Sequence, residues 1–264
     1  MKTIIILLAV FSSILTGCKD APKEKSNEPI ATEVTPSKTE KEELNIVPIE
    51  HASTVLEWGD ITIYVDPVGG AVAYDGQKQP DLILITDIHG DHFSLETLQE
   101  LNTEKAKIMV PQAVADKMPS EFATQLDILN NGDSKERYGI IVEAVPMYNL
   151  RKEALQMHPK GRGNGYVLNM GGKRIYFSGD TEDIPEMRSL ENIDTAFICM
   201  NLPYTMTEES AAEAVLEFQP KQVYPYHYRG NPNVSDVTIF KALVEKGNPA
   251  INVVQLDWYP KESY

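Results

Sequence analysis

The sequence predicts an α/β fold for residues 45–264, and three observations support this prediction. Short runs rich in β-branched residues are separated by turn residues such as Gly and Asp. One run, residues 82–85, is apolar throughout, as expected for a strand buried on both faces. Three other segments carry apolar residues at helical spacing behind a capping residue. The chain therefore opens with hairpin-like strands and inserts helices between later strands.

The predicted strands begin with residues 46–49, 54–56 and 61–65. A Gly59-Asp60 turn joins the last two, which predicts a hairpin. The buried strand 82–85 follows. The later strand candidates are residues 107–110, 140–145, 166–170, 174–177, 196–200, 222–226 and 252–256. They are compatible with two successive β-rich halves that meet near residue 150.

The predicted helices start at Ser94, Thr207 and Ser235, whose side chains can cap a first turn. Glu208 and Glu209 favour the start of the second helix because acidic groups stabilise a helix N-terminus. The apolar residues that face the core are Leu95, Leu98 and Leu101 in the first helix, Ala211, Val215 and Phe218 in the second, and Ile239, Leu243 and Val244 in the third.

The N-terminus has the pattern of an export signal. Met1 and Lys2 precede an apolar stretch, residues 3–15, that is too short to span a bilayer. The stretch ends in Leu15-Thr16-Gly17-Cys18, which resembles the lipobox of bacterial lipoproteins. This resemblance implies that residues 1–18 form a lipoprotein signal and that Cys18 is acylated, for instance with palmitate. A short buried helix with an incidental cysteine is the alternative.

Residues 19–44 predict a disordered tether, because they are rich in Lys, Glu, Pro, Ser and Thr and nearly devoid of large apolar residues. A flexible chain of this length spans on the order of 30 Å. We therefore expect an extracytoplasmic domain, in the periplasm or at the cell surface, that is attached to a membrane through its lipid anchor. Residues 45–264 would form that domain.

The charge of the chain argues against nucleic acid as a partner. The formal net charge is −15, and residues 1–44 contribute only −1, from 6 Lys against 7 acidic residues. The remaining −14 would repel phosphate backbones, and no dense basic run compensates. Of the 2 cysteines, Cys199 has no expected partner and lies in an apolar run, which predicts a reduced, buried thiol.

The strongest local signal for function is Thr86-Asp87-Ile88-His89-Gly90-Asp91-His92, directly after the buried strand. Imidazoles interleaved with carboxylates at a strand end can hold Zn²⁺ or a similar cation. The alternative to a metal site is an acidic turn that is simply exposed to solvent. Two further strand ends offer ligand types, at Ser178-Gly179-Asp180-Thr181 and Tyr224-Pro225-Tyr226-His227-Tyr228.

The order DxHxDH, SGDT and YPYHY, behind the opening EHASTVLEWGDITIYVDP, resembles the metallo-β-lactamase superfamily. Within it, the chain is similar to the branch of L-ascorbate-6-phosphate lactonase and N-acyl-phosphatidylethanolamine phospholipase D. The resemblance covers about residues 45–260. It implies a four-layer αββα sandwich with a metal site at one edge of two sheets.

The resemblance also implies the ligands. Asp91, His92 and His227 would hold one metal, and Asp180 would bridge to a second metal near Asp87 and His89. The chain departs from the family at this second metal. Asp87 replaces the first His of the HxHxDH motif, Asn149 stands where another His ligand is common, and His158 is the candidate replacement. We expect one or two Zn²⁺ ions, while the extra carboxylate of Asp87 favours a harder ion such as Mn²⁺ or Fe²⁺.

The implied activity is metal-dependent hydrolysis of an ester, lactone or phosphodiester bond by a metal-bound hydroxide, which Asp91 or Asp180 would orient. The alternatives are a phospholipase D-like phosphodiesterase, which a long apolar groove would favour, and a non-catalytic metal- or partner-binding lipoprotein with a degenerate site. The expected partner is a small-molecule or lipid-like substrate. Candidate substrate contacts, each weighed against an ordinary structural role, are His51, His158, Tyr204, Tyr228, Arg229, Lys160 and Arg162.

Asp66-Pro67 at the end of strand 61–65 favours a turn or capping role over metal binding. Trp58 and Trp258 are expected to pack in the core or at a sheet edge.

Overall fold

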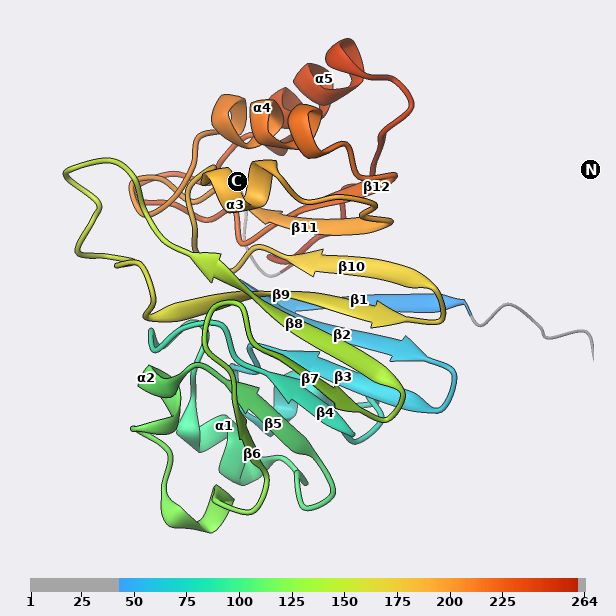
Figure 1. Ribbon diagram of the computed structural model, residues 1–264, viewed down its shortest axis with the longest axis vertical. Helices are drawn as coiled ribbons and strands as arrows, with labels where there is room; N and C mark the ends of the chain where they lie inside the picture. Colours follow the sequence, from blue (N-terminus) through green and yellow to red (C-terminus); the bar gives the residue numbers. More distant parts are fainter. Residues whose placement is uncertain (1–42, 261–264) are drawn as a thin grey trace, which may run out of the picture. The chain divides into compact units, whose positions relative to one another are not determined.

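The computed structural model describes residues 43–260. Two β-sheets pack face to face, and helices cover the outer face of each sheet (Figure 1). The layers therefore follow the order helix, sheet, sheet, helix, and the predicted αββα sandwich is confirmed.

The first sheet contains six strands in their sequence order. Its first three strands pair antiparallel, and its last four pair parallel. The predicted hairpin is present, with Trp58 opposite Ile61. Strand β4 lies inside the sheet and is fully buried, as its apolar sequence predicts. The strands are β1 Leu44–Glu50, β2 Ser53–Trp58, β3 Ile61–Val65, β4 Leu82–Leu84, β5 Lys107–Val110 and β6 Leu126–Ile128.

The second sheet contains seven strands, and here too each strand lies beside the next one in the sequence. β7 to β10 pair antiparallel and β10 to β13 pair parallel. The two β-rich halves therefore meet between β6 and β7, and not near residue 150. The strands are β7 Ser134–Arg137, β8 Ile140–Met147, β9 Gly163–Met170, β10 Lys173–Phe177, β11 Thr195–Cys199, β12 Gln222–Tyr226 and β13 Asn252–Val253.

The helices cover the sheets through their apolar faces. Leu98 and Val114 pack with the outer face of the first sheet, and Phe218 meets Tyr176 on the second at a ring-centroid distance of 6.2 Å. Ser94 and Thr207 cap their helices as predicted, whereas Asp236, and not Ser235, caps the last. The helices are α1 Leu95–Glu100, α2 Gln112–Ala115, α3 Pro185–Arg188, α4 Glu208–Phe218 and α5 Val237–Gly247, with 3₁₀ helices η1 Ala71–Tyr74 and η2 Ser120–Phe122.

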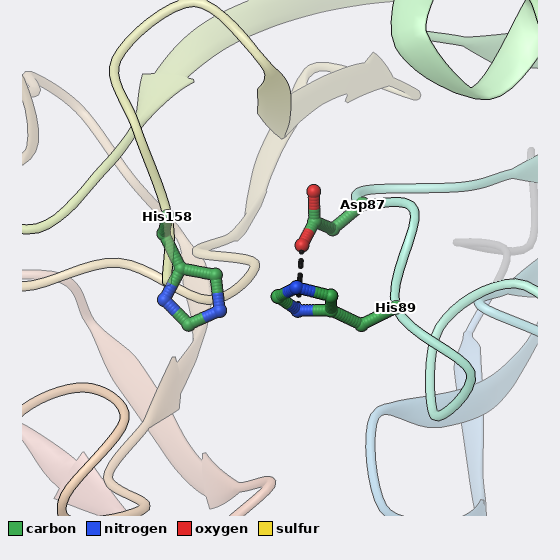
Figure 2. Close-up of side chains that lie close together, drawn as sticks. All are labelled: Asp87, His89 and His158. Carbon is green, nitrogen blue, oxygen red and sulfur yellow. Dashed lines mark ion pairs between the residues drawn. The ribbon is translucent and has the colours of Figure 1, made fainter. Parts of the chain in front are cut away.

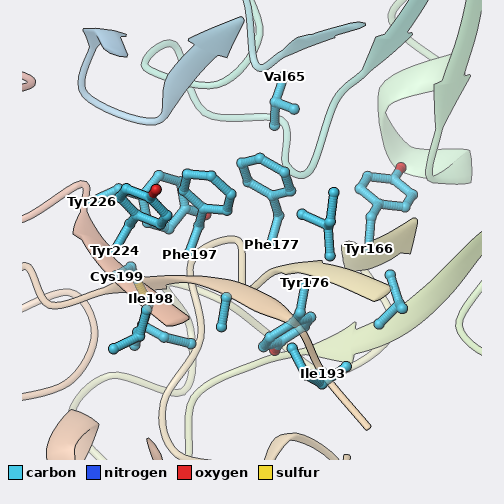
Figure 3. Packing of buried hydrophobic residues seen from close by; sticks show 14 of the residues in the cluster. Val65, Tyr166, Tyr176, Phe177, Ile193, Phe197, Ile198, Cys199, Tyr224 and Tyr226 are labelled. Carbon is cyan, nitrogen blue, oxygen red and sulfur yellow. The ribbon is translucent and has the colours of Figure 1, made fainter. Parts of the chain in front are cut away.

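A row of stacked aromatic rings lies between the two sheets. Phe177, Phe197 and Tyr224 occupy matching positions of β10, β11 and β12. Their centroids are 4.1 Å and 5.0 Å apart, with interplanar angles of 3° and 13°. Figure 3 shows these rings side by side, with Val65 of the first sheet above them. The row forms a packed base beneath the loops that follow β10 and β12.

Several other expectations can be compared with the structure. Cys199 is buried and free, and Trp258 is buried in the core, both as predicted. None of the helices within residues 43–260 combines the length and hydropathy that a membrane span requires. The predicted export signal, the lipid site at Cys18 and nearly all of the predicted tether lie outside the described residues.

Candidate metal centre

The predicted ligands meet at one edge of the sandwich, beyond the carboxyl ends of the parallel strands. The loop after β4 carries the DxHxDH motif, Asp180 follows β10, and His227 follows β12. His158 comes from the segment between β8 and β9. Carboxyl ends of parallel strands converge at one edge, so strand direction alone brings these distant segments together.

The first cluster consists of Asp91, His92 and His227, whose candidate ligand atoms lie within 4.8 Å of one another. The Nε2 atoms of His92 and His227 are 3.2 Å apart, and His227 Nε2 is 3.4 Å from Asp91 Oδ2. Both histidines are buried. Two imidazole nitrogens and a carboxylate therefore face one small volume, which is a suitable donor set for a divalent cation.

The second cluster consists of Asp87, His89 and His158, again with candidate ligand atoms within 4.8 Å of one another (Figure 2). His89 Nδ1 is 3.0 Å from Asp87 Oδ2, and the rings of His89 and His158 lie 5.2 Å apart. Figure 2 shows the ring of His158 facing the Asp87–His89 pair from the opposite side. His158 is therefore close enough to Asp87 and His89 to share one ion with them.

Asp180 lies between the two clusters. Its Oδ2 is 3.3 Å from His92 Nε2 and 3.2 Å from His158 Nε2, while its Oδ1 is 3.2 Å from His227 Nε2. One carboxylate thus contacts histidines of both clusters, as a bridging ligand would.

Buried groups behind the first cluster fix the ring of His92. The carboxylate of Asp66 accepts hydrogen bonds from the Thr86 N–H at 2.7 Å and the Thr86 hydroxyl at 2.6 Å. It also accepts one from His92 Nδ1 at 2.8 Å. Because a carboxylate only accepts, this contact assigns the proton of His92 to Nδ1 and leaves the Nε2 lone pair toward the site. The sequence does not predict this role of Asp66, although Asp66 does lie at a chain turn as expected, with a φ of 45°.

Asn149 supports His158 in a similar way. Its side-chain amide donates to the carbonyl oxygens of Ala154 at 3.0 Å and Tyr204 at 2.7 Å. Its Oδ1 lies 3.3 Å from His158 Nδ1. Asn149 therefore helps to orient the ring of His158 toward the second cluster.

Electrostatics couple the buried charges of the site. Burial alone would raise the pKa of Asp180, but the adjacent His227 and His92 hold it well below its usual range. Burial alone would lower the pKa of His227, but Asp180 and Asp91 raise it to about 9. Without a bound cation, protons on these imidazoles therefore balance the carboxylates, and metal binding must release them.

Two observations test whether these residues fit a metal. Asp180 Oδ1 is buried and meets no donor in hydrogen-bonding geometry among the described residues. The donor set combines imidazole nitrogens with carboxylate oxygens, which suits Zn²⁺, Mn²⁺ or Fe²⁺. The residues fit one or two divalent cations.

A cavity of about 460 Å³ opens over both clusters. His51 reaches it, with its ring against His227 and Tyr259 at centroid distances of 5.8 Å and 5.4 Å. The cavity lining consists of His51, His89, Asp91, Met157, His158, Asp180, Asn201, Tyr204, His227, Arg229 and Gly230.

Three predicted substrate contacts lie elsewhere. Tyr228 is outside the set of described residues that line the cavity, since its ring is buried against Tyr259 at 4.9 Å. Lys160 pairs with Glu186 at 2.6 Å on the surface. Arg162 binds Asp87, so its guanidinium is engaged by the protein itself.

Comparisons with known proteins agree with this geometry. Residues 45–227 match the family described as the beta-lactamase superfamily domain. A UPF0173 metal-dependent hydrolase of Thermococcus onnurineus is 30% identical over 70% of this chain and 86% of its own length.

Solved structures give the same result. The crystal structure of a candidate metal-dependent hydrolase from Parabacteroides distasonis is 36% identical, with a TM-score of 0.70 over 81% of this chain and 93% of that one. YhfI from Bacillus subtilis, a metallo-beta-lactamase fold protein, is only 10% identical but has a TM-score of 0.64 over 82% of this chain and 97% of its own, which shows the shared fold. The chain therefore belongs to the metallo-β-lactamase superfamily and, within it, to the UPF0173 family of metal-dependent hydrolases.

Proposed function

We propose that this hydrolase cleaves an ester, lactone or phosphodiester bond in a small, anionic substrate. The observation that carries the proposal is the contact of Asp180 with His92, His158 and His227, which joins two ligand clusters at the floor of an open cavity. When bound there, a divalent cation lowers the pKa of water and polarises the scissile bond.

The residues of the chain would act around that chemistry. Asp91 is the carboxylate of the first cluster and lines the cavity, and its side chain is 40% exposed against 4% for Asp180, so it can orient a water molecule and take up its proton. Arg229 also lines the cavity, beside the ring of Tyr259 at 5.3 Å, and its positive charge would attract an anionic group. Tyr204 and His51 would contact the substrate at the cavity wall.

The cavity supports a small substrate better than a phospholipid. Among the described residues that line it, Met157 is the single aliphatic side chain. A diacyl lipid would need a long groove lined by aliphatic side chains, which these residues do not form. The phospholipase D-like alternative is therefore not favoured.

The location of the enzyme is a separate part of the proposal, and it rests on the sequence alone. The export-type segment of residues 1–18 and the polar residues 19–44 support a lipid anchor at Cys18 and an extracytoplasmic, membrane-attached enzyme. A tether would let the domain act on solutes near a membrane surface.

The test combines metal analysis with a panel of ester, lactone and phosphodiester substrates. We expect His92→Ala and Asp180→Ala to abolish hydrolysis while the circular dichroism spectrum stays native. Asp194→Asn is the matched control, because Asp194 accepts a hydrogen bond from Arg174 N–H at 2.9 Å at the opposite, amino end of β11. Equal turnover in all three variants would refute the assignment of the site.

The preference for anionic over neutral substrates provides a second measurement. Arg229→Gln should raise KM for anionic substrates more than for neutral esters of the same acyl group. An equal change for both classes would remove the argument for an anionic substrate.

A further inference from the structure

The two ligand clusters differ in whether an arginine, a cation that cannot lose its charge by releasing a proton, already occupies them. In the first cluster, Asp91 and the adjacent Asp180 supply two carboxylates, and the groups they contact are the imidazoles of His92, His158 and His227. In the second cluster, the carboxylate of Asp87 is bound by the guanidinium of Arg162.

The Arg162–Asp87 pair has bidentate geometry. Nε donates to Oδ1 at 3.0 Å and Nη2 donates to Oδ2 at 2.7 Å. The Asp87 side chain is fully buried, and that of Arg162 is 17% exposed, so solvent screens this pair little. Paired N–H groups in this arrangement form one of the stronger charge-assisted contacts in proteins.

The same guanidinium also reaches a second ligand candidate. Arg162 Nη2 lies 3.3 Å from His89 Nε2 and donates to the carbonyl oxygen of Met157. His89 Nδ1 is meanwhile 3.0 Å from Asp87 Oδ2. Both ring nitrogens of His89 are therefore engaged by the Asp87–Arg162 pair.

Charge balance follows from these contacts. A divalent cation entering the first cluster has to displace only protons of the imidazoles, which leave to solvent, and it then meets the carboxylates of Asp91 and the intervening Asp180. In the second cluster Arg162 cancels the charge of Asp87 and cannot release its proton. An ion entering there must displace guanidinium N–H groups from Asp87 and His89.

We infer that Arg162 is a resident cation of the second cluster, so that the protein binds one divalent ion tightly in the first cluster and a second ion much more weakly. Arg162 thereby sets the metal stoichiometry of the enzyme at a given metal concentration. This inference concerns occupancy alone and does not depend on which bond the enzyme cleaves.

The experiment is a Zn²⁺ titration of the metal-free full chain by isothermal calorimetry, with bound metal measured after dialysis. The wild type should show one tight and one weak site. Arg162→Gln removes the charge, and we expect it to tighten the weak site about 10- to 100-fold, the range for losing a competing charged hydrogen bond. Arg162→Lys keeps the charge without the bidentate fork and should fall between the two.

Arg137→Gln is the matched control, because Arg137 binds Asp127 with the same side-on geometry, at 2.8 Å and 2.7 Å, on β7 and β6. It should leave both Zn²⁺ affinities unchanged. Two equally tight sites in the wild type would overturn the inference without any variant. An unchanged or weaker second site in folded Arg162→Gln would overturn it as well.

Discussion

Asp66 lies behind the site, and replacing it with Asn should weaken metal binding although the residue touches no substrate. The carboxylate accepts three hydrogen bonds, two from Thr86 and one from His92 Nδ1. In Asp66→Asn, the amide group must take the place of Oδ1 or Oδ2. At Oδ1 it would face the Thr86 N–H, and at Oδ2 it would face His92 Nδ1 and favour the tautomer with the proton on Nε2.

The first placement deprives the buried Thr86 N–H of its acceptor, and the second deprives the buried Thr86 hydroxyl of its acceptor. Such a loss costs about 1–3 kcal/mol of unfolding free energy. Loss of a group that orients a metal-binding histidine typically weakens metal affinity about 10- to 100-fold. We would measure the free energy of unfolding of the metal-free protein in urea, and its Zn²⁺ affinity by calorimetry. The expected result is a loss in both.

Asp81→Asn separates the two effects. Asp81 accepts the Thr62 N–H at 2.9 Å at the amino end of β4, at the far end of that strand from the metal centre. It should lower stability without changing Zn²⁺ affinity. If folded Asp66→Asn bound Zn²⁺ as tightly as the wild type, the orienting role of Asp66 would be wrong.

Three further predictions concern pH, the second cluster and the anchor. The pKa of His227 is raised from 6.5 to about 9 in the folded, metal-free chain, so the folded state binds more protons in this interval. The free energy of unfolding of the metal-free protein should fall as pH rises from 6.5 through about 9, and its apparent Zn²⁺ affinity should rise over the same interval. If neither the unfolding free energy nor the Zn²⁺ affinity changed with pH, the linkage between His227 protonation and metal binding would be wrong. Asn149→Ala should weaken the second metal ion about tenfold or more with the first unaffected, as read by calorimetry, and an equal loss at both sites would argue against its support of His158. Cys18→Ser should move the protein from the membrane to the soluble fraction, and continued need for detergent would count against lipidation.

Local patterns in the sequence predict most of the fold. The bounds of β3, β5 and β12 follow from their apolar runs, and Ser94 and Thr207 mark two helix starts. Strand β7 is missed because all four of its residues, Ser134–Arg137, are polar or charged, and pairing with β8 alone makes it a strand.

The glycines at the start of β9 conceal its first three residues, since the strand predicted for residues 166–170 begins at Gly163. A side chain at Gly163 would meet the Thr86 carbonyl oxygen at 2.7 Å, and one at Gly165 would meet that of Phe177 at 2.9 Å. Gly163 is needed because the loop after β4 of the first sheet lies against it, and Gly165 because the backbone at the end of the neighbouring strand β10 lies against it. Such long-range constraints have no local signature.

The candidate site was predictable where residues are neighbours in sequence or share a motif order. The DxHxDH segment, Asp180 and His227 follow from that order, and the structure brings them together. The pairing of Asp87 with Arg162, 75 residues away, depends on the path of the segment between β8 and β9. The contact of Asp66 with His92 likewise depends on parallel β3 and β4 ending side by side.

The origin of the ligands has a consequence for the physical behaviour of the whole domain. Asp91 and His92 lie in the loop that follows β4 of the first sheet, whereas Asp180 and His227 follow β10 and β12 of the second. An ion held by all four is a cross-link between the sheets at one edge of their shared core. A ligand that binds only the folded state adds about 4 kcal/mol of stability at a thousandfold excess over its Kd. The melting temperature of this enzyme should therefore rise with its metal content. Removal of the metal by a chelator should weaken the packing between the two sheets first at the edge that carries the site.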